Sequence, residues 1–259
     1  MVPSAARARG QVGRPAAPGV LPVLPATGRG QLVLSFAWIG CSLLLLTADT
    51  VRIIVAVELT RWVPLAVVAG MLTADFLSGL VHWGADTWGR ADLPVIGQRL
   101  LLPFRIHHIN PDDFLKRSFP DTNGDSAAAV MPVLLVVPWI PLDSVGWQAA
   151  AVFCVSLCAF AAMTNQIHQW AHMSSPPYPI RVLQQARLLL PHAAHAAHHS
   201  GKYDAHYCIT TGWCNRPLEA LRFFRRLEAV ITRTTGAHPR HDERGWPESR
   251  EDLHRGMAP

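Results

Sequence analysis

The sequence predicts an all-α integral membrane protein: a bundle of about four transmembrane helices with a histidine-rich, metal-binding cap on the cytoplasmic side. Half of the 259 residues are hydrophobic and only 16% are charged, whereas soluble domains average roughly 25% charged residues. Several apolar runs are long enough to cross a bilayer. Ten of the 13 histidines lie between positions 82 and 206, in tight groups.

Four apolar runs are the candidate spans, at residues 32–57, 62–81, 127–142 and 145–163. The third is the shortest and contains Pro132, Pro138 and Pro141, and roughly 17 residues are the usual minimum for a span. Residues 1–30 are rich in Ala, Pro, Gly and Arg and contain no acidic residue, which predicts a disordered basic arm. We expect a membrane domain over residues 31–233 and a polar, disordered tail over 234–259.

The distribution of Arg and Lys predicts the orientation, because cytoplasmic loops carry an excess of these residues. They are frequent in the N-terminal arm, in the segment after the second run and in the C-terminal region, and sparse in the other two loops. We therefore expect a multi-pass protein of a bacterial cytoplasmic membrane, with both termini and all histidine groups on the cytoplasmic side.

The formal net charge is +5, but the arginines form no compact basic run with interleaved aromatic residues, so nucleic acid is not an expected partner. Cys41, Cys154 and Cys158 lie in apolar segments, and Cys208 and Cys214 have no CxxC spacing. The cysteines thus predict neither a disulfide scaffold nor a thiolate metal site.

The histidines recur at helical spacing, at which residues three and four apart share one face of a helix. Imidazole nitrogens suit Zn, Cu, Fe and Ni, and this many ligands exceeds the needs of one tetrahedral zinc, so two metal ions are expected. The candidate ligands are His82, Asp86, His107, His108, His168, His172, His195, His198, His199 and His206. Asp86 is the expected carboxylate that balances the charge of the metals.

Two iron ions would activate O₂ for attack on an unactivated C–H bond, which acid-base chemistry cannot cleave. Asp75 lies inside the second run on the same helical stripe as His82. An intramembrane carboxylate is a functional candidate, and we expect it to orient a ligand histidine or to pair with a neighbouring helix. Gly79 is expected to leave space for a ligand or a lipid chain, and Asn123-Gly124 to form a turn.

Five strings carry most of these histidines or lie beside them: His82-Trp-Gly-Ala-Asp-Thr-Trp-Gly89, Phe104-Arg-Ile-His-His108, Thr122-Asn-Gly-Asp125, Thr164-Asn-Gln-Ile-His-Gln-Trp-Ala-His172, and His198-His199 followed by Tyr207-Cys-Ile-Thr-Thr-Gly-Trp213. With these strings, the sequence resembles the Kua family of plasmanylethanolamine desaturases over about residues 60–243. The resemblance implies desaturation of C1–C2 of an sn-1 alkyl ether chain, giving a vinyl ether. It also implies that His82, His107, His108, His168, His172, His195, His198 and His199 are essential. The ether-lipid branch usually has a further histidine where this chain has Arg117.

The expected substrate is an ether phospholipid and the expected co-substrate O₂. Electrons would come from a separate ferredoxin or cytochrome b5-like donor, since no flavin or haem motif is present. Three alternatives stay open: an acyl-chain desaturase of the phosphatidylglycerol type, to which the plant plastid branch of the family belongs, a related di-iron hydroxylase, and a histidine-rich metal transporter. A transporter would place its ligands near mid-membrane, whereas these histidines follow the ends of apolar runs.

Overall fold

The structure is a computed structural model that describes residues 21–200 and 203–240. Within these ranges the chain is helical and contains no strand, as the composition predicted. The helices are α1 (Arg29–Ala56), α2 (Trp62–Thr87), α3 (Leu102–Ile109), α4 (Pro111–Leu115), α5 (Phe119–Leu134), α6 (Val145–Ala162), α7 (Thr164–His172), α8 (Tyr178–Gln185), α9 (His192–His199), α10 (Asn215–Ala220) and α11 (Phe223–Thr235), with a π-helix at Gly97–Leu101 and a 3₁₀ turn at Val137–Trp139.

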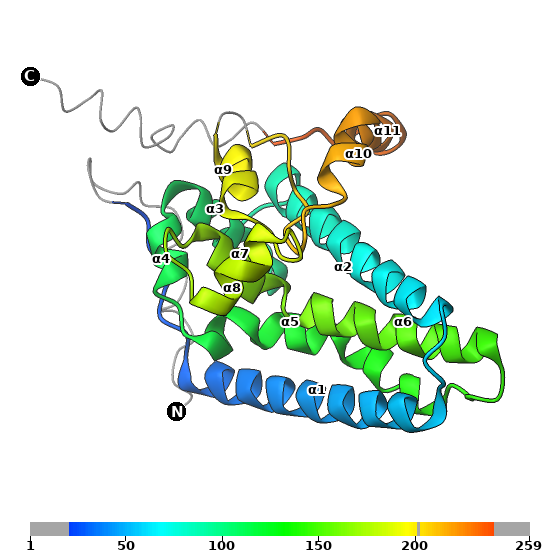
Figure 1. Cartoon of the computed structure of the whole chain (residues 1–259). Helices are drawn as coiled ribbons and strands as arrows, with labels where there is room; N and C mark the ends of the chain where they lie inside the picture. Colours follow the sequence, from blue (N-terminus) through cyan, green and yellow to red (C-terminus); the bar gives the residue numbers. More distant parts are fainter. Residues whose placement is uncertain (1–20, 201–202, 241–259) are drawn as a thin grey trace, which may run out of the picture.

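Helices α1, α2, α5 and α6 form the bundle, in which α2 packs on α6 and α1 packs on α5 (Figure 1). Among the described helices, α1, α2 and α6 are long and apolar enough to cross a membrane. Large hydrophobic side chains such as Leu44, Val55 and Leu65 are exposed on them. Lipid can cover such side chains, whereas water would make their exposure costly. Three of the four expected spans are thereby confirmed as helices of sufficient length.

The third expected span, 127–142, is built differently from the prediction. Helix α5 begins earlier, at Phe119, has 16 residues and ends at Leu134, because Pro132 and the prolines after it remove backbone donors. The Arg52 guanidinium of α1 donates hydrogen bonds to the carbonyls of Val137 (3.1 Å) and Ile140 (2.5 Å). These bonds satisfy carbonyl groups that a continuous helix would have paired internally.

The expected turn at Asn123-Gly124 is also wrong, since both residues lie inside α5. A Cβ on Gly124 would overlap the side chain of Ser35 on α1. The glycine therefore serves the close approach of two helices and not a reversal of the chain. Gly70 has the same function between α2 and α6, where a Cβ would lie 2.6 Å from the carbonyl oxygen of Phe153.

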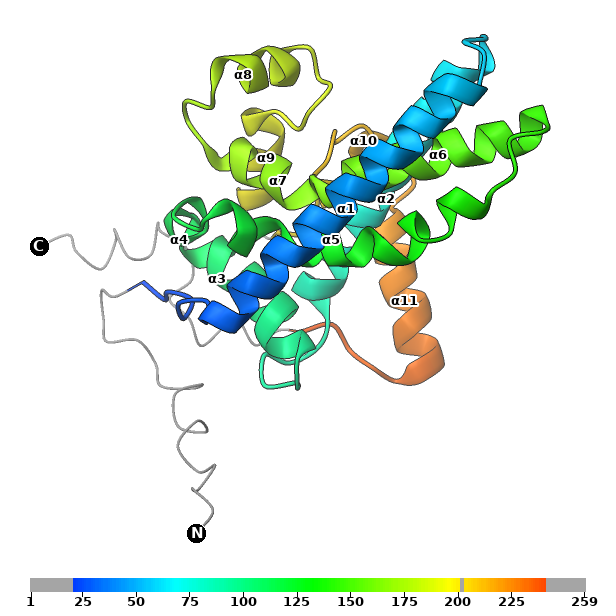
Figure 2. The same ribbon diagram turned by 90° about the horizontal axis from the view of Figure 1, so that it is seen from below.

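The cap consists of α3, α4, α7, α8 and α9, which gather at one end of the bundle (Figures 1 and 2). Pro111 starts α4 directly after α3 ends at Ile109, so the chain changes direction beside the His107-His108 pair. Helices α10 and α11 pack near the last turns of α2, where Trp83, Tyr207 and Phe224 form a buried cluster.

The expected arm and tail lie partly outside the described residues, at 1–20 and 241–259. Within the described part of the arm, the Leu24 amide donates to Asp113 Oδ2 (3.3 Å) and Asn110 Nδ2 donates to the Pro22 carbonyl (3.0 Å). Residues 21–28 thus lie along the cap, and the first helix begins at Arg29. At the other end, the Arg240 amide donates to the Thr87 carbonyl (2.9 Å).

Candidate metal centre

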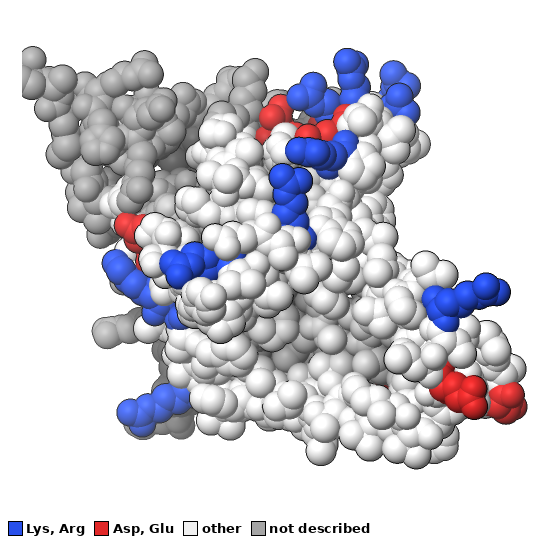
Figure 3. Space-filling view, in the orientation of Figure 1, with Lys and Arg blue, Asp and Glu red and all other residues white. Residues whose placement is uncertain are grey.

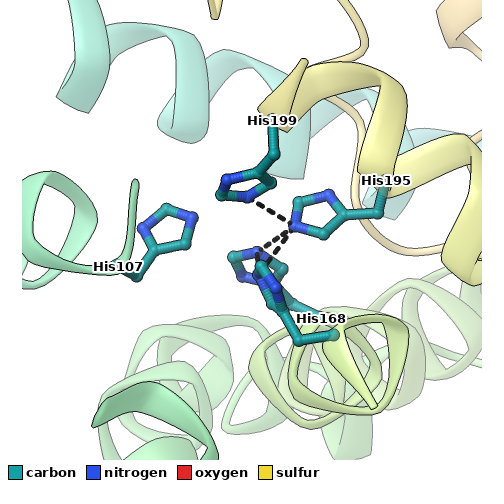
Figure 4. A group of neighbouring side chains, drawn as sticks. His107, His168, His195 and His199 are labelled. Carbon is teal, nitrogen blue, oxygen red and sulfur yellow. Dashed lines mark hydrogen bonds between the residues drawn. The ribbon is translucent and has the colours of Figure 1, made fainter. Parts of the chain in front are cut away.

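Five histidines from three cap helices converge on one point (Figure 4). The Nε2 atoms of His168, His172 and His195 form a triangle with sides of 2.9, 3.2 and 2.8 Å. His199 Nε2 lies 3.0 Å from His195 Nε2. The full group, called group A below, is His107, His168, His172, His195 and His199.

Group A has the geometry of a coordination shell. A ring nitrogen carries either one hydrogen or one lone pair, so a triangle of Nε2 atoms cannot be closed by hydrogen bonds. Two nitrogens bound about 2.1 Å from one ion at right angles are about 3 Å apart, which matches the observed separations. His107 Nε2 is buried and has no hydrogen-bond partner among the described residues. A buried ring nitrogen without such a partner is expected where its lone pair binds a metal ion.

A second group, called group B below, lies beside the first and includes the carboxylate predicted for the site. Asp86 lies 3.3 Å from His82 Nε2, 3.6 Å from His198 Nε2 and 3.7 Å from His108 Nε2. His198 Nε2 is 3.1 Å from His108 Nε2. Four potential ligands therefore surround a second position: His82, Asp86, His108 and His198.

The two histidine doublets each divide between the two groups. Successive residues of an α-helix point about 100° apart, so neighbouring histidines on one helix face different directions. On α3, His107 belongs to group A and His108 to group B; on α9, His199 belongs to group A and His198 to group B. The ring centroids within each doublet are 4.4 Å and 5.3 Å apart. Each doublet thus connects the two candidate metal positions across a short distance.

Backbone carbonyls fix the tautomer of three of these rings. A carbonyl only accepts, so the ring nitrogen facing it must carry the hydrogen. His82 Nδ1 donates to the Tyr207 carbonyl (3.0 Å), His107 Nδ1 to Phe104 (2.6 Å) and His198 Nδ1 to Ala205 (2.6 Å). In each case Nε2 is left with its lone pair toward the centre, which is the usual arrangement of a metal-bound histidine.

The cap keeps these imidazoles neutral, and a neutral ring is the form that binds metal. Burial lowers the pKa of His172 to about 3, that of His198 to about 4 and that of His199 to about 2. Burial, reinforced by the surrounding histidines, also lowers the pKa of His107, His108, His168 and His195 well below the usual value.

A chain of buried amides holds α7, which carries His168 and His172. Asn123 Nδ2 of α5 donates to Gln166 Oε1 (3.0 Å), and Gln166 Nε2 donates to Gln169 Oε1 (3.0 Å). Gln169 Nε2 then donates to the Phe114 carbonyl (2.8 Å), and Asn165 Nδ2 donates to the Thr122 carbonyl (3.0 Å). These positioning residues were not predicted from the sequence, although amide side chains flank the histidines at 164–172.

Among the described residues, the Asp75 carboxylate accepts hydrogen bonds from a loop and from no histidine. Its Oδ1 accepts hydrogen bonds from the amides of Thr210, Thr211 and Gly212 at 2.8–3.1 Å, and its Oδ2 accepts from the Cys214 amide at 3.0 Å. The same loop supplies the Tyr207 carbonyl to His82, so any influence of Asp75 on the centre passes through the loop. The space expected beside Gly79 is filled by Cys208, whose sulfur would lie 2.5 Å from a Cβ at this position.

His206 is not brought into either group. It has a positive φ of 61°, its amide donates to Glu219 Oε1 (2.9 Å), and its Nδ1 lies 3.3 Å from the same oxygen. Arg117, at the position where the ether-lipid branch has a histidine, pairs with Asp113 (3.0 Å) and Asp121 (3.4 Å) and donates to the Leu24 carbonyl (2.7 Å). Neither residue is part of the centre.

A cavity of about 550 Å³ opens onto the centre between α3, α4, α7 and α9. Its lining includes the histidines His108, His172, His195 and His199 and the larger side chains of Leu115, Ile109 and Tyr203. The cavity therefore gives a molecule of mixed polar and apolar character access to both groups.

The chain is similar in sequence to known proteins. Residues 71–242 match the lipid desaturase domain. The chain is 42% identical over 180 residues to plasmanylethanolamine desaturase of Myxococcus xanthus, covering 70% of this chain and 64% of the relative. It is 44% identical over 201 residues to plasmanylethanolamine desaturase 1 of Mus musculus, covering 73% of each.

A more distant relative is chloroplastic fatty acid desaturase 4 of Arabidopsis thaliana, 31% identical over 192 residues, with 73% of this chain and 56% of the relative covered. The chain thus spans slightly less than two thirds of the Myxococcus relative and little more than half of the plant protein. No solved structure matches. The family match extends over more than half of the sequence and contains every residue of groups A and B, and the chain therefore belongs to the lipid desaturase family.

Proposed function

We propose that this protein is an O₂-dependent, di-iron desaturase that introduces the vinyl-ether double bond at C1–C2 of the sn-1 alkyl chain of plasmanylethanolamine. The observation that carries the proposal is the pair of adjoining ligand groups, with eight imidazoles and one carboxylate at the end of a membrane bundle. The identity of 42–44% to two relatives named plasmanylethanolamine desaturase favours this substrate over an acyl chain.

Iron in groups A and B would supply the activation of O₂ needed to remove hydrogen from an unactivated C–H bond. The chain's own residues hold their lone pairs toward the two positions and keep the imidazoles neutral by burying them. The cavity beside Tyr203 and Leu115 admits the substrate next to the centre. This placement suits C1 and C2 of an alkyl ether, because these carbons lie beside the glycerol, close to the membrane surface and far from the chain's end.

The proposed orientation places the cap and both termini in the cytoplasm. The cap and the start of α1 lie at the same end of the bundle (Figure 1). Arg90, Arg99, Arg105 and Lys116 lie at this end too, in the segment that joins α2 to α5. An excess of Arg and Lys favours the cytoplasmic side. A cytoplasmic location would also give a soluble one-electron carrier access to the enzyme.

The decisive experiment is expression in a host that makes alkyl ether lipids but lacks plasmalogens, followed by lipid mass spectrometry. We expect lipids that have lost two hydrogens and whose new vinyl ether is cleaved by mild acid. The control is His168→Ala, which should insert in the membrane and give no product. Wild-type protein that contains iron and forms no vinyl ether under aerobic conditions would contradict the proposal.

The same experiment separates the alternatives. An acid-stable double bond in a phosphatidylglycerol acyl chain would favour the activity named for the Arabidopsis relative, and a product that has gained oxygen would favour a hydroxylase. Metal analysis of the purified protein addresses the transporter: zinc without iron would support it, whereas about two irons per chain would support the desaturase.

A further inference from the structure

The basic outer face of α10 and α11 lies at the end of a buried aromatic path that leads to group B. Arg216, Arg222, Arg225, Arg226 and Arg233 are all exposed, and Figure 3 shows the Lys and Arg side chains gathered over these helices at the top of the view. This surface is called the arginine face below. Of its five residues, Arg225 pairs with an acidic side chain, Asp204, at 3.1 Å.

Two acidic residues near the arginine face take part in hydrogen bonds with other residues. Glu228 accepts a hydrogen bond from Trp83 Nε1 (2.8 Å), and Glu219 accepts from the His206 amide. The five exposed arginines thus outnumber Asp204, Glu219 and Glu228, and this surface carries a net positive charge. Such a field attracts an acidic partner and accelerates its association.

Beneath the arginine face, aromatic rings are packed in sequence toward the metal ligands. The ring centroid of Phe223 is 5.3 Å from that of Phe224, and Phe224 is 4.9 Å from Tyr207. Tyr207 is in turn 5.8 Å from His82 and 5.4 Å from His198. Both histidines belong to group B, so closely packed π-systems connect the surface of α11 with one metal position.

The arginine face is less suited to binding a membrane surface than to binding a protein. A helix that binds at a membrane surface inserts an apolar face among the lipids. The apolar face of α11, formed by Phe224, Leu227 and Ile231, already packs against Trp83 and its neighbours. Of the large hydrophobic side chains on α11 itself, Val230 is the one that is exposed.

Resting on the proposed desaturase function, we propose that the arginine face is the docking site of an acidic one-electron carrier protein, whose electrons enter at group B. Formation of each double bond releases two hydrogens from the chain. Reduction of one O₂ to two waters consumes these hydrogens together with two further electrons and two protons. Two reduced carriers are therefore oxidised in each turnover, so the docking must be transient, as is typical of small electron-transfer interfaces.

The test compares Arg226→Glu with Arg181→Glu, an identical charge change on exposed residues of two different helices. Arg181 lies on α8, well apart from α11 in Figure 2. The probe is a purified acidic [2Fe–2S] ferredoxin, and the protein is held in nanodiscs of zwitterionic lipid. We expect Arg226→Glu to weaken ferredoxin binding and slow ferredoxin-driven reduction by about tenfold at low salt, with little change in Arg181→Glu.

Two further measurements make the result decisive. Reduction by dithionite, which needs no docking, should proceed equally in wild type and both variants. In wild type, added salt should weaken ferredoxin binding, because it screens the attraction. Equal ferredoxin binding by wild type and Arg226→Glu would overturn the proposal. So would a difference in ferredoxin binding between these two proteins that is seen only in nanodiscs containing anionic lipid. Binding is measured without turnover, so a failure to form vinyl ether would count against the proposed function and not against this site.

Discussion

Groups A and B lie side by side but differ in charge and in origin. Group A has five neutral imidazoles and comes entirely from the cap helices α3, α7 and α9. Group B contains the carboxylate of Asp86 and takes His82 from α2, a helix long enough to span the membrane. Group A also lines the open cavity with three of its members, His172, His195 and His199.

This difference in charge and origin indicates that groups A and B have different roles. A cation at group B would be balanced by the charge of Asp86, whereas one at group A would have neutral ligands only and would lie closer to the cavity. We therefore expect group A to face the substrate and group B to face the aromatic path from α11. The following experiments test that comparison.

The largest effects are expected from removal of one ligand in either group. His168→Ala in group A and His82→Ala in group B should each lower desaturase activity more than about 100-fold, since even partners of metal ligands contribute roughly 10–100-fold. Each variant should retain about one iron in place of two. Metal analysis and Mössbauer spectra check this, and full iron content in either variant would show that its histidine is not a ligand.

A smaller loss is expected when group B keeps its shape but loses its charge. Asp86→Asn should reduce activity by about 10–100-fold, because a neutral amide oxygen balances no positive charge. Iron should be lost from group B before group A when a chelator is titrated into the variant. If both irons leave together, as in wild type, then Asp86 does not distinguish the two positions.

Asp75 tests whether the loop supports group B in particular. Asp75→Asn should lower the free energy of unfolding by about 1.5–3 kcal/mol, the usual worth of a hydrogen bond to a charged group. Because Tyr207 orients His82 from the same loop, the spectrum of the group B iron should change more than that of group A. Thermal unfolding and Mössbauer spectroscopy measure the two effects. An Asp75→Asn protein that is destabilised with both iron signals unchanged would limit Asp75 to a folding role.

The smallest effect is expected from His206→Ala. His206 lies outside both groups and pairs with Glu219 on a partly exposed surface, so its loss should change stability by less than about 0.5 kcal/mol. Iron content and vinyl-ether formation should remain those of wild type. A clear loss of iron would show that His206 is a metal ligand.

The helical class, three of the spans and nine of the ten residues proposed as ligands could be predicted from the sequence, because the reasons are local. Apolar length identifies a span, and helical spacing places His168 with His172 on one face of a helix. Local reasoning failed at Asn123-Gly124, where residues that usually form a turn lie inside α5. There the glycine serves a contact with Ser35 on α1, a partner 89 positions away that no local pattern reveals.

What the sequence by itself determined is a membrane-spanning helical protein with a surplus of imidazoles at helix ends, because hydropathy and helical periodicity depend on neighbouring residues. Only the tertiary structure decided how the ligands divide: His107 from His108, and His198 from His199, into two groups. It also decided that Asp75 holds the loop at residues 210–214 and that His206 lies outside both groups. These assignments depend on side chains far apart in the chain meeting in space, and packing of α2, α3, α7 and α9 brings them together.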